Sequence, residues 1–191
     1  MRIAIYGGTF DPVHIAHLII ADYACAELSL DKLLFVPSYS PPHKLSVAIT
    51  APSHRLNMVK IAIAQNRKFK LSDYEIMKEG TSFTVDTLRY YSEYFQVQRK
   101  HLYLIIGADN LVDFHLWKDP DEILRLAQIA VANRPANCIS KVSIKDFITL
   151  GAPLLDISAS MIRKRIQQHK SVRYLVPEKV VKYIQQNGLY Q

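Results

Sequence analysis

Short apolar runs alternate with helix-like stretches along the whole chain, and this alternation most restricts how the chain can fold. The first run, RIAIY at residues 2–6, is apolar and β-branched and ends at a glycine pair. The stretch that follows, residues 14–28, carries apolar residues at helical spacing. Strands that alternate with helices usually form a parallel sheet, because each connection crosses one face of it. The pattern therefore predicts an α/β fold with a parallel sheet.

The same patterns place the other elements. Strands are predicted at residues 2–6, 32–37, 69–73, 101–107, 128–134 and 152–158. Helices are predicted at residues 14–28, 54–65, 84–95, 119–127, 160–169 and 177–187. Residues 38–53 are rich in proline and show no period, which predicts a long loop of the kind that often serves function. We expect N-caps at Thr84, Asp119 and Ser158 and a C-terminal cap at Gly188.

Composition favours one domain, residues 1–191, with a substantial core. The chain has 191 residues, of which 49% are apolar and 21% charged. No apolar run approaches the roughly 18 residues that cross a bilayer. The segment after Arg2 does not resemble a secretion signal, and Cys25 and Cys138 form no disulfide framework. We therefore expect a cytoplasmic protein with no membrane partner.

The net charge of +7 is concentrated near the C-terminus. Residues 141–191 hold nine Lys and Arg against three Asp and Glu, whereas residues 1–140 hold fifteen against fourteen. A basic excess can bind nucleic acid, a membrane surface or a phosphorylated small molecule, or can simply be a solvated helix face. A nucleic-acid-binding module would interleave aromatic and basic residues, and no such motif is present. We therefore expect no nucleic-acid partner.

Two glycines and two histidines stand where the first strand gives way to the first helix, in GGTFDPVHIAH at residues 7–17. Gly7 and Gly8 let a ligand approach the backbone, and a helix N-terminus attracts anions. His14 and His17 are three residues apart, so they share one face of the first turn. Imidazoles in that place can donate hydrogen bonds to phosphate oxygens.

Other readings of this stretch are open. Two histidines near a helix start can be surface caps or satisfied core groups. The spacing His-x-x-His occurs in zinc sites, but no third ligand is evident. The glycines do not follow the GxGxxG spacing of dinucleotide-binding dehydrogenases. No Ser-His-Asp or Cys-His arrangement suggests a nucleophilic enzyme. Phosphate binding fits the glycines best.

GGTFDPVHIAH resembles the GxFDPxHxGH signature of the nucleotidyltransferase superfamily. The resemblance to bacterial nicotinate-nucleotide adenylyltransferases covers essentially the whole chain and continues, in order and spacing, through PPHK (41–44), HRLNM (54–58), SFTVDTL (82–88), GADNLVDFHLWKD (107–119) and ISASMIR (157–163). It implies a Rossmann-like, three-layer nucleotidyltransferase fold with helices on both faces and a small C-terminal helical part, about residues 157–191. The chain departs from the family at Ala16, usually glycine, and at Ser160, usually threonine.

The resemblance implies that the chain joins ATP and nicotinate mononucleotide to give nicotinate adenine dinucleotide and pyrophosphate in NAD biosynthesis, with Mg²⁺ accompanying ATP. The mononucleotide phosphate would attack the α-phosphorus of ATP directly, so no general base is needed. A same-fold enzyme for another phosphorylated acceptor, such as phosphopantetheine or the amide mononucleotide, is the alternative. A regulatory homologue that binds nucleotides without turnover is a third possibility. The sequence carries no signal for the oligomeric state.

The resemblance also implies the ATP site. His14 and His17 would be the catalytic pair on the phosphates, and Ser160 and Arg163 would hold the β- and γ-phosphates. Asp109 would bind the ribose. The remaining ATP contacts are implied at Gly7, Gly8, Thr9, Gly107, Arg134 and Ser158. Asp109 and Ser158 can equally be ordinary helix caps, and Arg134 a surface arginine.

For nicotinate mononucleotide, the resemblance implies a phosphate contact from Lys44 with His43 beside it. Trp117 would stack on the pyridine ring, although a tryptophan is more often a core residue. Backbone N–H groups around Thr84 and Trp117 would hold the nicotinate carboxylate. Phe10 would approach the mononucleotide through its ring, next to the backbone of Thr9. No residue is expected to be a metal ligand.

Overall fold

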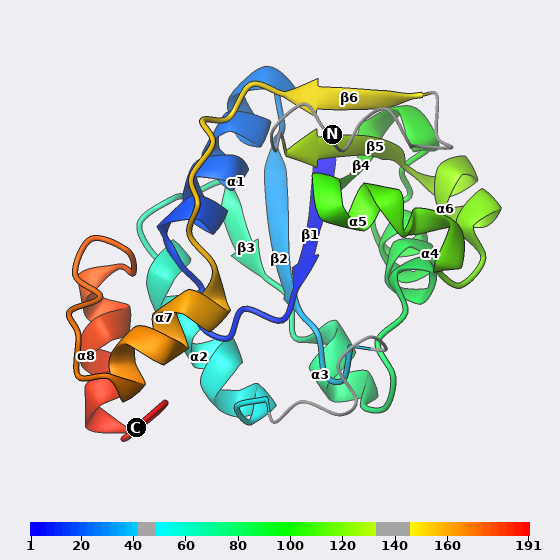
Figure 1. Ribbon diagram of the computed structural model, residues 1–191. Helices are drawn as coiled ribbons and strands as arrows, with labels where there is room; N and C mark the ends of the chain where they lie inside the picture. The colour runs from blue at the N-terminus through cyan, green and yellow to red at the C-terminus, as the bar shows by residue number, and fades with distance from the viewer. Residues whose placement is uncertain (42–48, 133–145) are drawn as a thin grey trace.

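The computed structural model describes residues 1–41, 49–132 and 146–191, and its centre is a six-stranded parallel sheet (Figure 1). The strand order is β3-β2-β1-β4-β5-β6. The strands are β1 (Ile3–Gly8), β2 (Lys32–Pro37), β3 (Phe69–Leu71), β4 (Leu102–Gly107), β5 (Gln128–Ala132) and β6 (Phe147–Leu150). The expected α/β fold with a central parallel sheet is confirmed.

Helices cover both faces of the sheet, with α1, α2, α7 and α8 on one side and α4, α5 and α6 on the other (Figure 1). Their bounds are α1 (Ile15–Glu27), α2 (Pro52–Ile63), α3 (Tyr74–Lys78), α4 (Thr84–Tyr94), α5 (Ala108–Val112), α6 (Pro120–Leu126), α7 (Ala159–Gln167) and α8 (Glu178–Gln186). Two short 3₁₀ helices complete the described elements: η2 (Arg99–His101) directly precedes β4, and η3 (Phe114–Leu116) follows α5.

Successive residues of each central strand point into two different cores. In β1, Ala4 and Tyr6 belong to the cluster under α1, α2 and α8, whereas Ile3 and Ile5 belong to the cluster under α4, α5 and α6. This follows from the two-residue repeat of a strand, and it explains why the strands are apolar without a break. A sheet buried on both faces leaves ligands only its edges and its strand ends.

The C-terminal helices share the first of these cores. Ile162 of α7 and Val180 and Ile184 of α8 are almost fully buried in the same cluster as the sheet residues. The N–H group of Ile15, at the start of α1, donates to the carbonyl of Leu175 at 2.9 Å. The C-terminal part is therefore attached to the start of α1. Among the described residues, no helix combines the length and the apolar character needed to span a bilayer.

The strand predicted at residues 152–158 is wrong. The edge strand is instead β6, and the chain then runs irregularly to α7 (Figure 1). Leu154 is 54% exposed and lines a cleft with Leu155 instead of packing in the sheet. Apolar residues in a short run predict burial, but they do not reveal whether a neighbouring strand is available for pairing.

Three of the four predicted cap positions are confirmed. The Ser158 hydroxyl accepts from the Met161 N–H at 3.2 Å, and Gly188 follows α8 with a φ of +57°. The prediction for Thr84 is wrong, because Thr84 is the first helical residue of α4 and Phe83 is its N-cap. Asp119 does occupy the N-cap position of α6, with a φ of +48° but no capping bond from its side chain. The Asp119 carboxylate instead accepts from Arg89.

Candidate active site

A cleft of about 1140 Å³ opens at the carboxyl ends of β1 and β4. The chain order of the sheet reverses between these two strands, and loops that leave them in opposite directions create a crevice there. Of the sixteen predicted site residues, His43, Lys44 and Arg134 lie outside the described residues. The other thirteen line this cleft: Gly7, Gly8, Thr9, Phe10, His14, His17, Thr84, Gly107, Asp109, Trp117, Ser158, Ser160 and Arg163.

The two histidines form a stacked pair at the start of α1. Their ring centroids are 3.7 Å apart at an interplanar angle of 23°. His14 occupies the N-cap position, and its backbone N–H donates to Nδ1 of His17 at 3.2 Å. Because Nδ1 of His17 accepts this bond, the proton of the neutral ring lies on Nε2. His17 therefore offers an Nε2–H donor at the wall of the cleft.

Ser158, Ser160 and Arg163 form a second polar group on the cleft wall, at the N-terminus of α7. The hydroxyl oxygens of Ser158 and Ser160 are 3.1 Å apart. Nη1 of Arg163 donates to the backbone carbonyl of Asp11 at 2.7 Å. This bond joins α7 to the segment after β1, so the histidine pair and the serine–arginine turn face one shared cleft despite about 150 intervening residues.

Gly7 and Gly8 are glycines for two different structural reasons. A Cβ at Gly8 would come within 3.0 Å of the Phe10 ring, so Gly8 makes room for that ring. Phe10 is only 2% exposed and packs against Tyr6, Phe35 and His17. The Phe10 ring belongs to the core although Phe10 also lines the cleft, and its expected contact with a mononucleotide stays a prediction. The Phe10 ring packs against the His17 ring and so supports it.

Gly7, in contrast, would place a Cβ in open space on the cleft side, with no protein atom within 4 Å. We therefore expect Gly7→Ala to leave the thermal unfolding midpoint unchanged but to weaken ATP binding, because the methyl group occupies space that only a ligand would fill. Calorimetry measures the unfolding midpoint, and an ATP titration measures the binding affinity. Unchanged ATP affinity would show that no ligand approaches this backbone.

Asp109 and Gly107 lie together at the end of β4. Asp109 is in the first turn of α5, and its carboxylate folds back over Gly107 so closely that a Cβ at Gly107 would collide with Oδ1. The position is not an N-cap, since Gly107 occupies that place. A carboxylate held at the mouth of the cleft can accept hydrogen bonds from a ribose, as predicted for Asp109.

Trp117 and Thr84 line another part of the cleft. The indole of Trp117 is partly buried and packs on Phe114 with centroids 5.3 Å apart. Its backbone N–H donates to the Phe114 carbonyl at 3.1 Å. The expected contact of backbone N–H groups around Thr84 and Trp117 with a nicotinate carboxylate stays a prediction. Thr84 begins α4, and the first N–H groups of a helix have no acceptor within the helix.

Sequence reasoning missed Arg55, which is fully buried beneath the cleft. Burial lowers the pKa of its guanidinium, while Asp11 and other acidic groups oppose that shift. The guanidinium donates at 2.7 to 3.1 Å to the backbone carbonyls of Thr9, Ser38, Tyr39 and Thr50. Arg55 thus ties together the chain after β1 and the chain after β2. The HRLNM motif at residues 54–58 contains Arg55, but it suggested no role for this side chain.

Glu75 of α3 was missed as well. Its carboxyl lines the cleft and accepts from the Thr87 hydroxyl at 2.6 Å, and burial raises its pKa. No pattern in the sequence distinguished Glu75 from an exposed helix residue.

Burial raises the pKa of the Cys25 thiol to about 11, so this thiol is not a nucleophile at neutral pH.

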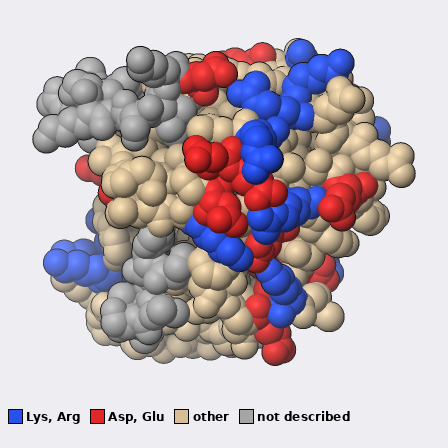
Figure 2. All heavy atoms as spheres, turned by 90° about the vertical axis from the view of Figure 1, so that its right-hand side faces the viewer, with Lys and Arg blue, Asp and Glu red and all other residues tan. Residues whose placement is uncertain are grey.

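The face formed by α4 and α6 carries both signs of charge. Figure 2 shows Lys and Arg side chains interleaved with Asp and Glu there. Asp86 accepts from Lys78 at 2.6 Å, from Arg89 at 3.2 Å and from Lys118 at 3.3 Å, and Arg89 also pairs with Glu122. This face therefore presents no basic patch of the kind that binds nucleic acid.

The strand order, together with the imidazole, hydroxyl and guanidinium groups that can bind phosphate around the crevice, is what the class of nucleotidyltransferases requires. A family model described as cytidylyltransferase-like matches residues 5–165. A "probable nicotinate-nucleotide adenylyltransferase" of Clostridium tetani is 42% identical, with 98% of each chain covered, and its counterpart in Tropheryma whipplei is 40% identical, with 97% of each covered. The chain belongs to the cytidylyltransferase-like family and, within it, to the nicotinate-nucleotide adenylyltransferases.

Solved structures agree on the fold. The nicotinic acid mononucleotide adenylyltransferase of Plasmodium falciparum, in complex with NaAD, superposes with a TM-score of 0.81 at 23% identity, covering 99% of this chain and 97% of that one. A Vibrio parahaemolyticus structure described as a nicotinate-nucleotide adenylyltransferase gives 0.73 at 18% identity, with 100% and 96% covered. The nucleotidyltransferase-like fold therefore extends over the full described chain.

Proposed function

We propose that the chain transfers AMP from ATP to nicotinate mononucleotide, giving nicotinate adenine dinucleotide and pyrophosphate, as a cytoplasmic step of NAD biosynthesis. The observation that carries this proposal is the shared cleft. It joins phosphate donors, His17 and Arg163, to a flat aromatic surface, Trp117. The relatives at about 40% identity over their full length carry the name of this activity.

The proposed reaction is a direct displacement. An oxygen of the mononucleotide phosphate forms a bond to the α-phosphorus of ATP, the bond from that phosphorus to the bridging oxygen breaks, and pyrophosphate leaves. The attacking oxygen is already ionised, so no side chain has to remove a proton. Nε2–H of His17 and the guanidinium of Arg163 would stabilise the charge that grows on the phosphates. The cleft would hold the two substrates in line.

We propose that Mg²⁺ enters together with ATP. Within residues 1–41, 49–132 and 146–191, no group of three or more His, Cys, Asp and Glu side chains could hold a metal ion. The phosphate oxygens of ATP are themselves ligands for this hard cation. When bound, Mg²⁺ neutralises the departing pyrophosphate. On this proposal the protein binds the cation through its substrate.

The neighbouring structures support the choice of ligands. The Plasmodium falciparum structures contain NaAD in one case and APC in the other. A fold that accommodates a dinucleotide product and a nucleotide analogue is compatible with the two-substrate reaction proposed for this chain.

The test is an acceptor comparison. ATP is incubated with nicotinate mononucleotide, the amide mononucleotide or phosphopantetheine, and pyrophosphate release is followed. Turnover that is fastest with the acid mononucleotide supports the proposal. Turnover with phosphopantetheine alone would assign the chain to another acceptor, and ATP binding without turnover would identify a regulatory homologue.

Replacing Trp117 tests the acceptor site. We expect Trp117→Ala to raise the KM for nicotinate mononucleotide by about 5- to 160-fold, because stacking on an aromatic ring stabilises a bound base by ~1–3 kcal/mol. The KM for ATP should stay within about twofold, since Trp117 packs with the core cluster under α4, α5 and α6, whereas Arg163 belongs to α7 on the other face of the sheet. Trp117→Phe should recover part of the loss. An equal rise in both KM values would show a general distortion instead of a lost stacking surface.

A further inference from the structure

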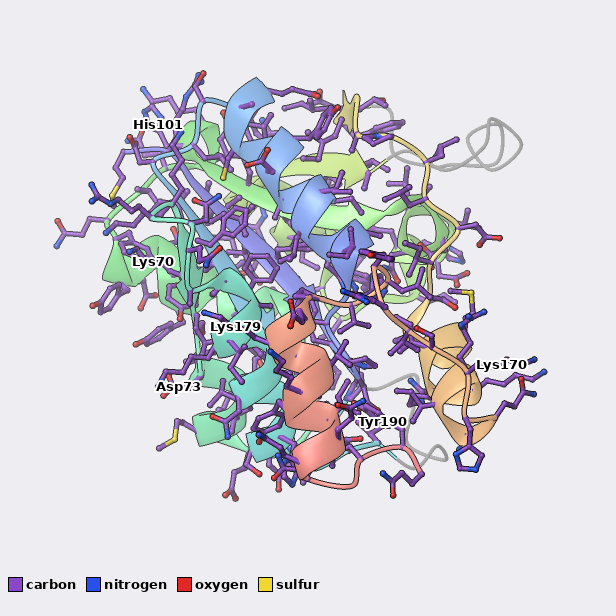
Figure 3. All side chains as sticks on the ribbon, turned by 90° about the vertical axis from the view of Figure 1, so that its left-hand side faces the viewer. Lys70, Asp73, His101, Lys170, Lys179 and Tyr190 are labelled. Atoms are coloured by element: carbon purple, nitrogen blue, oxygen red, sulfur yellow. The ribbon has the colours of Figure 1, made fainter. Side chains whose placement is uncertain are left out.

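The second-to-last residue of the chain reaches the segment that follows β1. Figure 3 labels Tyr190 close to α8, whose last turn is closed by Gly188. The Tyr190 hydroxyl donates to Oδ1 of Asp11 at 2.6 Å, across 179 residues of sequence. Tyr190 is half-buried and its hydroxyl also lies 3.9 Å from Sδ of Met58. The very end of the chain is therefore anchored beside the candidate active site.

Asp11 is a buried carboxylate, only 3% exposed, and needs donors. Its Oδ1 accepts the Tyr190 bond, and its Oδ2 accepts a longer bond, 3.3 Å, from the Thr50 N–H. Burial, and then the hydrogen bond and the charge of Asp11, raise the pKa of Tyr190. The hydroxyl therefore remains a protonated donor throughout the physiological range.

Arg163 is another group beside Asp11. Nη1 of Arg163 donates to the Asp11 backbone carbonyl at 2.7 Å, but it is 4.0 Å from the carboxylate oxygen Oδ2. A guanidinium has five N–H donors, so this anchor leaves others for the cleft that Arg163 lines. A buried carboxylate without enough donors would draw the guanidinium inward, because a close pair with Arg is strong in a low-dielectric setting.

We propose that Tyr190 is a positioning residue for Arg163: by supplying the donor that Asp11 needs, it leaves the guanidinium directed at the ATP phosphates. This inference rests on the proposed function, which places those phosphates at Arg163. Tyr190 thus acts on ATP binding through Asp11 and touches no substrate.

The test removes one hydroxyl. In Tyr190→Phe the ring still packs near Met58, and we expect the Kd for ATP to rise about tenfold, as for a lost hydrogen bond to a charged group. The matched control is Tyr183→Phe on α8, whose hydroxyl bonds His54 and Asn57 away from the cleft. This control should bind ATP as the wild type does. In steady state, Tyr190→Phe should raise the KM for ATP and leave that for the mononucleotide within about twofold.

A double-mutant cycle separates positioning from a general structural role. Once Arg163 is replaced by alanine, adding Tyr190→Phe should change the Kd for ATP by less than about twofold, because no guanidinium remains to be positioned. A tenfold effect that persists in the Arg163→Ala background, an equal loss in Tyr183→Phe, or no loss in Tyr190→Phe would overturn the inference. A wild-type protein that binds no ATP would overturn the proposed function, and this inference with it, and is distinguished because the reference titration itself fails.

Discussion

His17→Ala is expected to lower kcat for pyrophosphate release by about 10²- to 10³-fold, the range found when one donor to a developing charge is removed. His17 lines the cleft, and the proton of its neutral ring lies on Nε2 because Nδ1 accepts from the His14 N–H at 3.2 Å. Alanine removes the donor and keeps the helix. The loss of the bond to the N-cap residue should cost about 1 kcal/mol of folding stability, so the variant should remain folded at assay temperature.

The control for this variant is His54→Ala. His54 also makes one side-chain hydrogen bond, to the Tyr183 hydroxyl at 2.9 Å, but it does not line the cleft. It should lose a similar amount of stability and keep wild-type turnover. Undiminished turnover in His17→Ala, measured with both substrates saturating, would remove this histidine from the mechanism.

Arg55→Ala should produce the largest loss of stability, about 3–5 kcal/mol, with the thermal midpoint lowered by about 6–20 °C. The substitution leaves four backbone carbonyls without their donor and removes one of the two guanidinium groups near the buried Asp11 carboxylate, the other being that of Arg163. Turnover of the folded fraction should fall as well, because the chain after β1 and the chain after β2 are no longer joined beneath the cleft.

Two further substitutions sharpen this test. Arg55→Lys keeps the charge but has fewer and less widely spread donors, so its midpoint should fall between those of the wild type and Arg55→Ala. Arg67→Ala removes an exposed arginine of the loop before β3 and should shift stability by no more than about 0.5 kcal/mol. A midpoint of Arg55→Ala within 2 °C of the wild type would contradict a supporting role for this guanidinium.

Most elements could be predicted because their signals are local. Apolar runs located five of the six strands, and helical spacing located the long helices to within two or three residues. The short α3 and α5 were not predicted, since five residues hold less than two turns of pattern. The strand at 152–158 was wrong because pairing depends on which edge of the sheet is open, and that is not a local property.

The residues of the candidate site could also be predicted from the sequence. The motifs named His14, His17, Ser160, Arg163 and Trp117, and the structure brings all of them to one cleft. It also shows that the Phe10 ring is buried in the core and that the Trp117 N–H has an acceptor within the protein. Which substrate each residue binds stays a prediction.

The sequence by itself determined which residues could meet phosphate, because glycine, imidazole and guanidinium carry that chemistry wherever the chain places them. Only the tertiary structure decided how those residues are held. The hydrogen-bond partners of Arg55 and Tyr190 lie 16 to 179 residues away in the sequence, except for Thr50, which is close to Arg55 in the chain. Local patterns report propensity and burial, whereas a hydrogen bond between distant segments exists only after the sheet and both helical layers have assembled.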